Sequence, residues 1–269
     1  MKIGKETVPR TAICAANRST IVVRGRDLCA QLIGQRSFTE YFWLLVTGVE
    51  PTDIQRQMLD ACLVAIAEHG LVPSVQASRM TLAAAPECMQ GAVAAGLLGC
   101  GSVILGASET AGRFLSEIVT GSSVSGKGLR NTAVNALRHR VAESRPIPGY
   151  GHPLHKDQDP RAHELLALAR RLGVHELHCE AAEIVEASLH EVTGKQLKMN
   201  VSVALPAVLL DVGFPTAGLK GIPLLGRTAG LIGHLLEELQ RPIGFALSYQ
   251  AARSAIYDGE APDGFQPEI

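Results

Sequence analysis

The sequence predicts a largely helical protein, and three observations support this fold class. Hydrophobic residues make up 46% of the 269 residues and aromatic residues only 4%. The apolar content is therefore mostly Ala, Leu, Val and Ile, and Ala and Leu favour helices. Apolar residues also recur at helical spacing through most of the chain. Helix-capping residues, Pro and Gly bound many of these stretches.

The first half of the chain predicts short helices separated by Gly and Pro. Residues 20–23, Thr-Ile-Val-Val, predict one short strand or an extended arm. Ser37 is a suitable N-cap for the helix that follows it, and Gly48 closes that helix. The helices expected in this half cover residues 28–33, 38–47, 51–69 and 73–84.

The second half begins with a stretch rich in small residues. Residues 88–117 contain many glycines and alanines, which predict close, buried helix–helix contacts, including contacts across a subunit boundary. Residues 121–128 predict a flexible turn at a domain edge, and they lack the spacing of a P-loop. The tail after Pro242 is expected to be weakly structured. Further helices are expected at residues 129–144, 160–172, 175–192, 199–212 and 224–239.

Charge and cysteine content limit the classes of function. The chain has 25 Lys and Arg residues against 26 Asp and Glu residues, a net charge of −1. This balance argues against a general binder of nucleic acid or of anionic membranes. The apolar runs are too short and too rich in glycine for convincing membrane spans. The six cysteines are scattered without a C-x-x-C pair, and no signal peptide is evident, so we expect reduced thiols in a cytoplasmic protein.

One group of side chains raises the question of a metal site. His175, His178 and Cys179 lie close together in the sequence. Their spacing matches no common ligand pattern, and no second cluster completes it. An ordinary helix surface is the favoured interpretation, and we predict no metal cofactor.

The most informative stretch is residues 145–162, Arg-Pro-Ile-Pro-Gly-Tyr-Gly-His-Pro-Leu-His-Lys-Asp-Gln-Asp-Pro-Arg-Ala. Its prolines and glycines exclude a regular helix and give the backbone a stiff path. It ends at a helix start, with Asp159 as the N-cap and Pro160 at the first helical position. A rigid, cation-rich loop before a helix is a candidate for binding an anionic ligand. An ordinary proline-rich connector is the alternative.

This stretch resembles the signature of the citrate synthase family. The length of the chain resembles the citryl-CoA lyase branch, including the lyase-like end of ATP-citrate lyase, more than full-length citrate synthases. Segments in the family's order extend over nearly the whole chain. They are Arg24–Asp27, Ser37–Thr52, Glu68–Ser74, Gly101–Ala107, Asn200–Val201, Arg227–His234 and Arg241–Pro242.

The resemblance implies an all-α protomer with two domains and a ligand cleft between them. The large, dimer-forming domain would comprise residues 1–112 and 206–269, and the small domain residues 113–205. The resemblance also implies a homodimer or a higher homo-oligomer. The implied ligands are coenzyme A, as an acyl-CoA substrate or product, and a small polycarboxylate such as oxaloacetate.

The resemblance further implies roles for individual residues. His152 matches the histidine that hydrogen-bonds the carbonyl or hydroxyl oxygen of the polycarboxylate, and His69 matches a further histidine on that ligand. Three arginines match those that hold its carboxylates, the last from the partner subunit: Arg161, Arg227 and Arg241. Guanidinium groups suit this task because they pair with carboxylates in a bidentate manner. The residues that match the coenzyme A site are Pro148, Gly149, Tyr150 and Gly151, for the adenine, and Lys156, for a phosphate.

Two positions depart from the family's pattern. The family's enolising site pairs a histidine in Gly-Pro-Leu-His-Gly-Gly-Ala with an aspartate in Asn-Val-Asp. Here Ile104 aligns with the histidine and Ser202 with the aspartate. Forming an enol from an acyl-CoA needs a base for the α-proton and a donor for the developing oxyanion. Ile104 can supply neither, and Ser202 is a poor base without an activating neighbour.

The sequence leaves three hypotheses for the function. The first is an enzyme that makes or cleaves a C–C bond between an acyl-CoA and an oxo-acid such as oxaloacetate. In it, His152 would act on the hydroxyl or carbonyl group, and Ser202, or a water it holds, would protonate the acyl-CoA carbon. The second is a catalytically impaired or repurposed relative that binds CoA or a polycarboxylate as a sensor or as a subunit of a complex. The third, a purely structural helical protein, is disfavoured by the retained arginines and His152.

Overall fold

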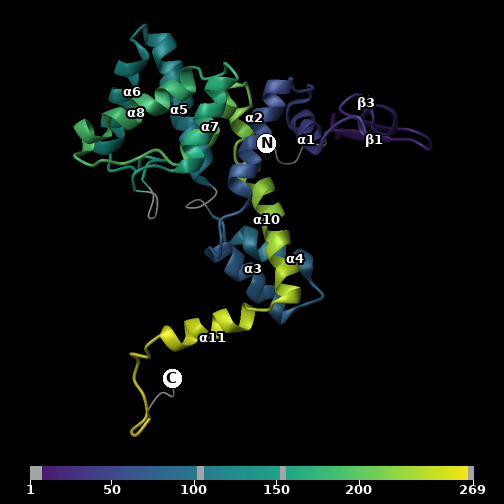
Figure 1. The fold of residues 1–269 in the computed structure, drawn as a ribbon, viewed down its shortest axis with the longest axis vertical. Helices are drawn as coiled ribbons and strands as arrows, with labels where there is room; N and C mark the ends of the chain where they lie inside the picture. The colour runs from purple at the N-terminus through teal and green to yellow at the C-terminus, as the bar shows by residue number, and fades with distance from the viewer. Residues whose placement is uncertain (1–7, 102–105, 152–155, 266–269) are drawn as a thin grey trace. The chain divides into compact units, whose positions relative to one another are not determined.

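The computed structural model describes residues 8–101, 106–151 and 156–265, and these residues are mostly helical (Figure 1). They group into two compact units, each made of two chain segments. Unit 1 comprises Met1–Cys62 and Thr110–Leu219, and unit 2 comprises Leu63–Glu109 and Lys220–Ile269. The assignment of residues 113–205 to a small domain, and of the remainder to a large one, stays a prediction.

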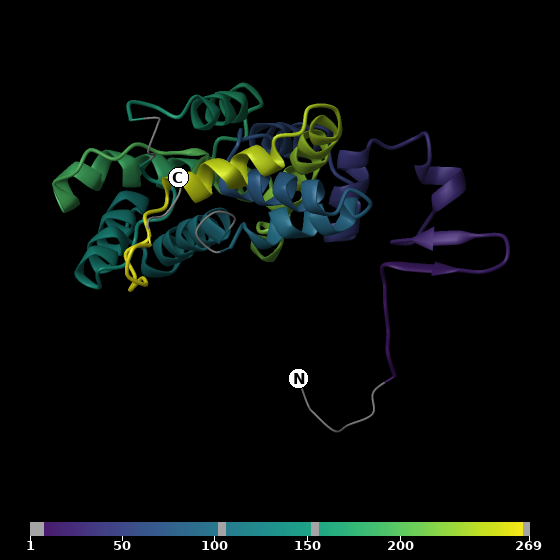
Figure 2. The ribbon, with the colours of Figure 1, turned by 90° about the horizontal axis from the view of Figure 1, so that it is seen from below.

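Unit 1 begins with a three-stranded antiparallel sheet, where the sequence predicted one strand in an all-α protein (Figure 2). Its strands are β1 (Cys14–Ala16), β2 (Ile21–Val23) and β3 (Arg26–Asp27). Arg24 and Gly25 form the turn between β2 and β3, and both have positive φ, 50° and 80°. Such a pair is what a two-residue type I′ hairpin turn requires. The all-α class is therefore wrong for these residues, because strands of two or three residues are too short to show alternation in the sequence.

The helices of unit 1 include α9, an almost wholly apolar helix that is buried nearly from end to end. Helices α7 and α8 pack against it, and α6 packs against α8. A helix that is apolar all round belongs inside a protein, and α9 accordingly forms the centre of this unit. The helices are α1 (Phe38–Thr47), α2 (Asp53–Ala67), which ends in unit 2, α5 (Gly106–Ser125), which begins in unit 2, α6 (Leu129–Ala142), α7 (Pro160–Arg171), α8 (Leu177–Thr193) and α9 (Val201–Asp211), with the short η1 (Leu28–Leu32) and η2 (Thr216–Gly218).

Helix α5 extends further than the sequence predicted. Residues 121–125, expected to be part of a flexible turn, form its last turn. Ser123 Oγ donates a hydrogen bond to Val119 O over 3.1 Å, and Ser125 Oγ donates one to Gly121 O over 2.6 Å. Both hydroxyls donate to carbonyls one turn earlier in the same helix. They therefore do not draw the backbone into a non-helical turn, and the helix includes the Ser-rich segment. The turn is confined to residues 126–128.

Unit 2 contains helices that approach one another closely through small residues. A Cβ atom on Gly96 would lie 2.8 Å from Leu231 Cδ1 and 3.0 Å from Ser74 O. Helix α4 therefore lies tightly against both α10 and α3, which confirms the close helix contacts expected from this stretch. The helices of unit 2 are α3 (Pro73–Ala84), α4 (Met89–Leu98), α10 (Gly221–Gln240) and α11 (Gly244–Ser254).

The tail after Pro242 is helical over residues 244–254, so the prediction of a weakly structured tail is wrong there. The carboxylate of Glu238, near the end of α10, accepts hydrogen bonds from Ile243 N over 3.0 Å and from Gly244 N over 2.7 Å. This side chain caps the start of α11 from the preceding helix. Because the cap comes from outside the new helix, the residues just before α11 give no start signal.

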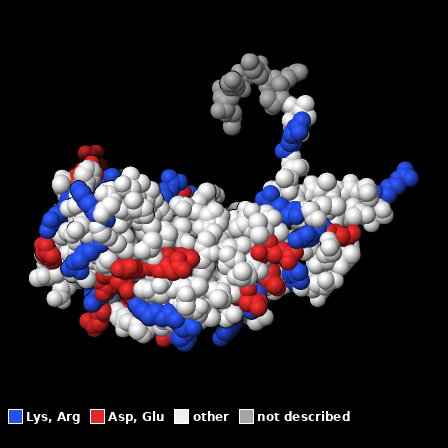
Figure 3. Space-filling view, turned by 90° about the horizontal axis from the view of Figure 1, so that it is seen from above, with Lys and Arg blue, Asp and Glu red and all other residues white. Residues whose placement is uncertain are grey.

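The charged side chains of both signs are interspersed on the face shown in Figure 3. Uncharged residues separate them over much of that face. In the described part of the chain, no helix is both long enough and apolar enough to cross a membrane.

Candidate active site

The predicted site residues fall into both units. Unit 1 contains the predicted coenzyme A loop and two further site residues, Arg161 and Ser202. Unit 2 contains three of the predicted polycarboxylate residues: His69, Arg227 and Arg241. His152 and Ile104 lie outside the described residues.

The predicted coenzyme A loop, residues 148–151, is held by backbone hydrogen bonds to the segment before α9. Tyr150 pairs with Met199 in an isolated antiparallel bridge. Gly151 N donates to Lys198 O over 2.7 Å, and Asn200 N donates to Gly149 O over 2.9 Å. The loop therefore has a fixed path before any ligand arrives, which lowers the entropy cost of binding.

Gly149 makes the closest contact between this loop and α9. Its φ is +87°, and a Cβ at this position would lie 2.3 Å from Val203 Cβ. Real Cβ contacts are never that short, so only glycine combines this backbone conformation with this approach. Tyr150 anchors the loop from the other side, since its buried hydroxyl donates to Ala182 O over 2.8 Å. Burial, with the charge of Glu186 in addition, raises the pKa of Tyr150 well above its usual value, so the phenol stays protonated.

Asp159 connects Arg161 to the start of α9. Its carboxylate accepts two hydrogen bonds from the Arg161 guanidinium, Nε at 3.0 Å and Nη2 at 2.9 Å, and one from Val201 N at 3.0 Å. It also caps α7 by accepting from Arg161 N. Burial alone would raise the pKa of Asp159, but the hydrogen bonds and the positive charge of Arg161 outweigh it and lower the pKa. The carboxylate is therefore ionised, and it orients Arg161 through a bidentate pair.

Ser202 lies in the first turn of α9 and is half-buried. Its backbone N–H donates to Asn200 Oδ1 over 2.9 Å, while Asn200 Nδ2 donates to Gly151 O over 2.7 Å. Asn200 thus joins the start of α9 to the predicted coenzyme A loop. Within the described part of the chain, the Ser202 hydroxyl has no hydrogen-bond partner and hence no base that could activate it.

A cavity of about 640 Å³ lies beside these residues in unit 1, between α7, α8 and residues 198–199. Charged groups of both signs line it, including Asp159 and Lys198, and Lys198 Nζ lies 3.2 Å from Glu186 Oε1. The exposed Lys156 directly precedes Asp157, another lining residue. The sequence had indicated Asp159 as a helix cap and Asn200 as part of a segment in the family's order, and Lys198 carried no signal of its own.

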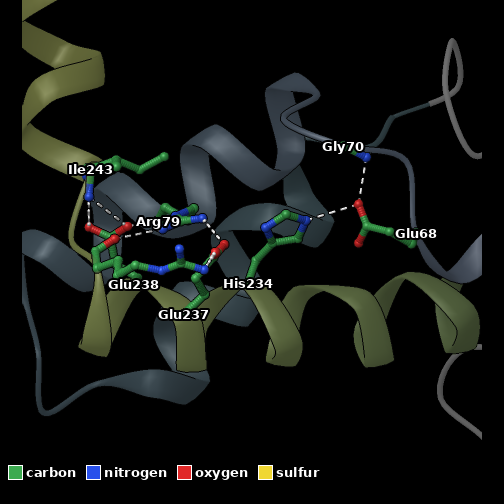
Figure 4. Close-up of polar contacts among 9 residues, drawn as sticks. Glu68, Gly70, Arg79, His234, Glu237, Glu238 and Ile243 are labelled. Carbon is green, nitrogen blue, oxygen red and sulfur yellow. Dashed lines mark hydrogen bonds and ion pairs between the residues drawn. The ribbon is translucent and has the colours of Figure 1, made fainter.

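In unit 2, Glu68 joins the end of α2 to α10 (Figure 4). Glu68 Oε1 lies 3.0 Å from His234 Nε2 and accepts a hydrogen bond from Gly70 N over 2.5 Å. Burial would raise the pKa of Glu68, but these hydrogen bonds and the His234 charge lower it instead. The ionised carboxylate therefore accepts the Nε2 proton of His234.

Arg79 forms a second, buried ion-pair group in unit 2 (Figure 4). Its Nε donates to Glu238 Oε2 over 2.6 Å, its Nη1 to Glu237 Oε2 over 2.8 Å, and its Nη2 to Arg241 O over 3.1 Å. Arg79 and Glu238 are only 2% and 3% exposed. By contrast, the Arg241 side chain is 79% exposed and donates to Glu237 Oε1 over 2.8 Å. Arg79 therefore fixes the backbone at Arg241 and leaves the predicted ligand-binding guanidinium on the surface.

Of the three predicted ligand-binding residues of unit 2, Arg241 lines an open pocket of about 650 Å³, and His69 and Arg227 do not. Arg241, His234 and Glu68 all line it. Arg227 is buried on α10, seven residues before His234 and on the same face of that helix. His69 directly follows Glu68. In the sequence, His234 appeared only as the end of the segment Arg227–His234, and Glu237, another polar residue of this pocket, carried no signal.

One of the histidines that raised the question of a metal site, His178, lies at a helix cap. His178 Nδ1 lies 2.8 Å from Asp211 Oδ1, and the carboxylate of Asp211 accepts the backbone N–H groups of Glu176, His178 and Cys179. Among the described residues, no group of three His, Cys, Asp or Glu side chains could hold a metal ion. Asp211 thus caps the start of α8, and the His178 side chain contacts this capping carboxylate.

The fold and the two groups of residues describe a mostly helical protein that presents arginines and histidines suited to an anionic ligand. The family described as "Citrate synthase, C-terminal domain" matches residues 6–243. The chain therefore belongs to the citrate synthase family.

Curated relatives are similar over about three quarters of this chain. Citrate synthase 2 of Bacillus subtilis is 26% identical over 206 residues, which are 74% of this chain and 51% of that protein. The citrate/2-methylcitrate synthase of the same organism is 28% identical over 211 residues, 75% of this chain and 52% of that protein. The chain thus spans about half the length of these relatives.

Solved structures include a relative of almost the same extent. The citryl-CoA lyase of Hydrogenobacter thermophilus is 32% identical, with a TM-score of 0.83 over 97% of this chain and 98% of that one. The ATP citrate lyase of Methanothrix soehngenii, in complex with citrate and coenzyme A, gives a TM-score of 0.76 at 21% identity. That match covers 99% of this chain and 44% of the other. The second likeness supports the fold alone.

Proposed function

We propose that this protein is a C–C lyase of the citryl-CoA lyase type. It would cleave a C–C bond in the CoA thioester of a hydroxy-polycarboxylic acid, or form that bond between an acyl-CoA and an oxo-acid. One observation carries the proposal. The similarity to the citryl-CoA lyase of Hydrogenobacter thermophilus extends over nearly the full length of both chains. The predicted coenzyme A loop and Arg161 are both fixed in position by hydrogen bonds, and this supports the proposal. Groups that are already in place bind a ligand at a lower entropy cost.

In the proposed reaction, His152 removes the proton from the substrate hydroxyl as the C–C bond breaks. The hydroxyl carbon becomes the carbonyl of the oxo-acid, and the bonding electrons pass to the acyl-CoA as an enolate. A proton returned to its carbon by Ser202, or by a water that Ser202 holds, completes the acyl-CoA. His69 and three arginines, Arg161, Arg227 and Arg241, bind the polycarboxylate end. The backbone of residues 148–151 receives the adenine, and Lys156 pairs with a phosphate.

A second candidate function is a non-catalytic relative that binds CoA or a polycarboxylate as a sensor or as a subunit of a complex. The isolated hydroxyl of Ser202, within the described residues, favours it. The alignment of Ile104 with the usual histidine favours it as well. Tight binding of CoA without turnover would distinguish this function from the lyase.

One assay separates the two candidates. The purified protein is incubated with citryl-CoA, and the oxaloacetate released is followed through a coupled dehydrogenase. We expect turnover in the wild type and its loss in His152→Ala, because that variant lacks the base for the hydroxyl proton. His190→Ala, which removes an exposed imidazole from α8, is the matched control and should keep full activity. Absence of turnover in the wild type, or unchanged turnover in His152→Ala, would contradict the lyase mechanism.

We further propose a cytoplasmic homodimer in which Arg241 completes the site of the partner subunit. The exposure of the Arg241 side chain supports this proposal. The Arg241→Ala and His152→Ala chains are unfolded, mixed in equal amounts and refolded together. The mixture should regain about a quarter of wild-type activity, since half of the dimers are mixed and each mixed dimer contains one intact site. Each variant alone should be inactive. Failure of the mixture to recover activity, despite mixed dimers on a native gel, would place Arg241 in the site of its own chain.

A further inference from the structure

Helix α10 and the end of α2 approach each other at backbone distance. A Cβ on Gly230 would lie 2.1 Å from Ala67 O, and one on Gly226 would lie 2.9 Å from Ile66 Cγ2. These two glycines are one helical turn apart, so they place one face of α10 directly on the last turn of α2. His234, a further turn along the same face, is thereby brought within 3.0 Å of Glu68.

The carboxylate of Glu68 connects this contact to the backbone of the following residues (Figure 4). It accepts a hydrogen bond from the N–H group of Gly70 on one side and one from His234 on the other. The Nδ1 atom of His234 is buried and has no hydrogen-bond partner among the described residues. Glu68 is therefore the group that fixes the imidazole of His234, and the pair fixes the backbone position of His69.

We propose that Glu68 and His234 are positioning residues. They hold His69 at a fixed position relative to Arg227, so that both residues can bind the polycarboxylate end of the substrate. This inference rests on the proposed function. Arg227 lies on the same helix as His234, so the pair connects two of the predicted ligand-binding residues of unit 2, His69 and Arg227, through one rigid contact. Neither Glu68 nor His234 needs to touch the ligand for this role. Loss of this pair weakens binding of the polycarboxylate end of the substrate. It leaves the predicted coenzyme A loop, which belongs to unit 1, unchanged.

The binding test compares two dissociation constants by calorimetry, one for citrate and one for coenzyme A. In Glu68→Ala and His234→Ala we expect the dissociation constant for citrate to rise about tenfold or more, because a charged hydrogen bond is lost, and that for CoA to stay constant. Glu68→Gln keeps one acceptor oxygen for the N–H groups of Gly70 and His234, so its loss of citrate affinity should be smaller than that of Glu68→Ala. Glu87→Ala is the matched control, since it removes an exposed carboxylate of unit 2 that makes no hydrogen bond within the described residues. Equal changes in both constants, or none, would overturn the proposal.

A second readout does not depend on ligand or turnover. The imidazole NMR signals of His69, assigned through their loss in His69→Gln, report its surroundings in the free protein. We expect them to shift in Glu68→Ala and in His234→Ala and to stay in place in Glu87→Ala. Unmoved His69 signals in both pair variants would show that the pair does not position His69. If the wild type binds neither citrate nor citryl-CoA, the proposed function fails, and the NMR result still decides whether the pair acts on His69.

Discussion

The two units hold their predicted ligand residues by different kinds of interaction. In unit 1, backbone hydrogen bonds between residues 149–151 and 198–200 fix the predicted coenzyme A loop. In unit 2, two side-chain contacts fix the backbone beside Arg241 and His69: the ion pair of Arg79 with Glu238 and the hydrogen bond between His234 and Glu68. A frame of backbone bonds depends on the path of the chain and on its glycines. A frame of ion pairs depends on both partners being present and correctly charged.

The comparison predicts different weak points in the two units. Unit 2 should be most sensitive to removal of one member of its buried pair. Unit 1 should be most sensitive to added volume where glycine permits close approach, and less so to loss of a single side chain.

Arg79→Ala should have the largest effect on stability. It leaves the carboxylate of Glu238, only 3% exposed, without its guanidinium partner. Breaking a buried ion pair by removing one partner costs about 3–5 kcal/mol. The free energy of unfolding from urea titrations should fall by that amount, and hydrogen exchange should show faster exchange in α11, whose first N–H groups Glu238 caps.

Arg138→Ala is the matched control for this prediction. Arg138 pairs with Glu191 over 3.0 Å, but both side chains are more than half exposed. Exposed pairs contribute about 0–1 kcal/mol, so this loss should be small. Equal losses in Arg79→Ala and Arg138→Ala would show that the buried pair is not what secures unit 2.

Local signals in the sequence predicted most helices correctly. Ser37 and Gly48 bound α1 as expected, with a capping box between Ser37 and Glu40. Asp159 and Asn200 cap α7 and α9 through their own side chains. These features depend on residues within a few positions of one another, so the sequence shows them directly.

One of the errors and the main omission arise where distant residues act. The cap of α11 comes from Glu238 in the preceding helix, and the fixing of His69 comes from His234, 166 residues after Glu68. The family resemblance indicated His69 and Arg227 but not the pair that connects them. Pairing across such separations depends on how α10 packs against α2, which no local pattern encodes.

Gly149→Ala tests the backbone frame of unit 1. The new Cβ would lie 2.3 Å from Val203 Cβ at a φ of +87°. Strain and overpacking together should cost about 2–4 kcal/mol in the free energy of unfolding. Gly173→Ala is the matched control, because Gly173 also has positive φ, +71°, but a Cβ there meets nothing within 4 Å. It should cost about 1–2 kcal/mol, from strain alone. Equal costs at both positions would show that the close approach to α9 is not important.

Asp159→Asn should have a smaller effect, and one that depends on pH. The pKa of Asp159 is lowered from its usual value of 3.8, chiefly because hydrogen bonds and the charge of Arg161 outweigh the effect of burial. A carboxyl group with a lowered pKa in the folded state adds stability at pH values above its unfolded pKa. That contribution is lost as the pH falls through the lower, folded value.

The asparagine variant should therefore be less stable than the wild type by about 1–2 kcal/mol at neutral pH, because it keeps one acceptor oxygen but loses the charge that pairs with Arg161. The difference should shrink as the pH falls below the usual Asp value of 3.8. Urea titrations across this range measure it, with Asp258→Asn, which changes an exposed carboxylate, as a control that should show little difference at any pH. A difference that persists undiminished in acid would mean that Asp159 acts through its shape and not its charge. Unit 1 would then depend on backbone geometry even where Asp159 pairs with Arg161.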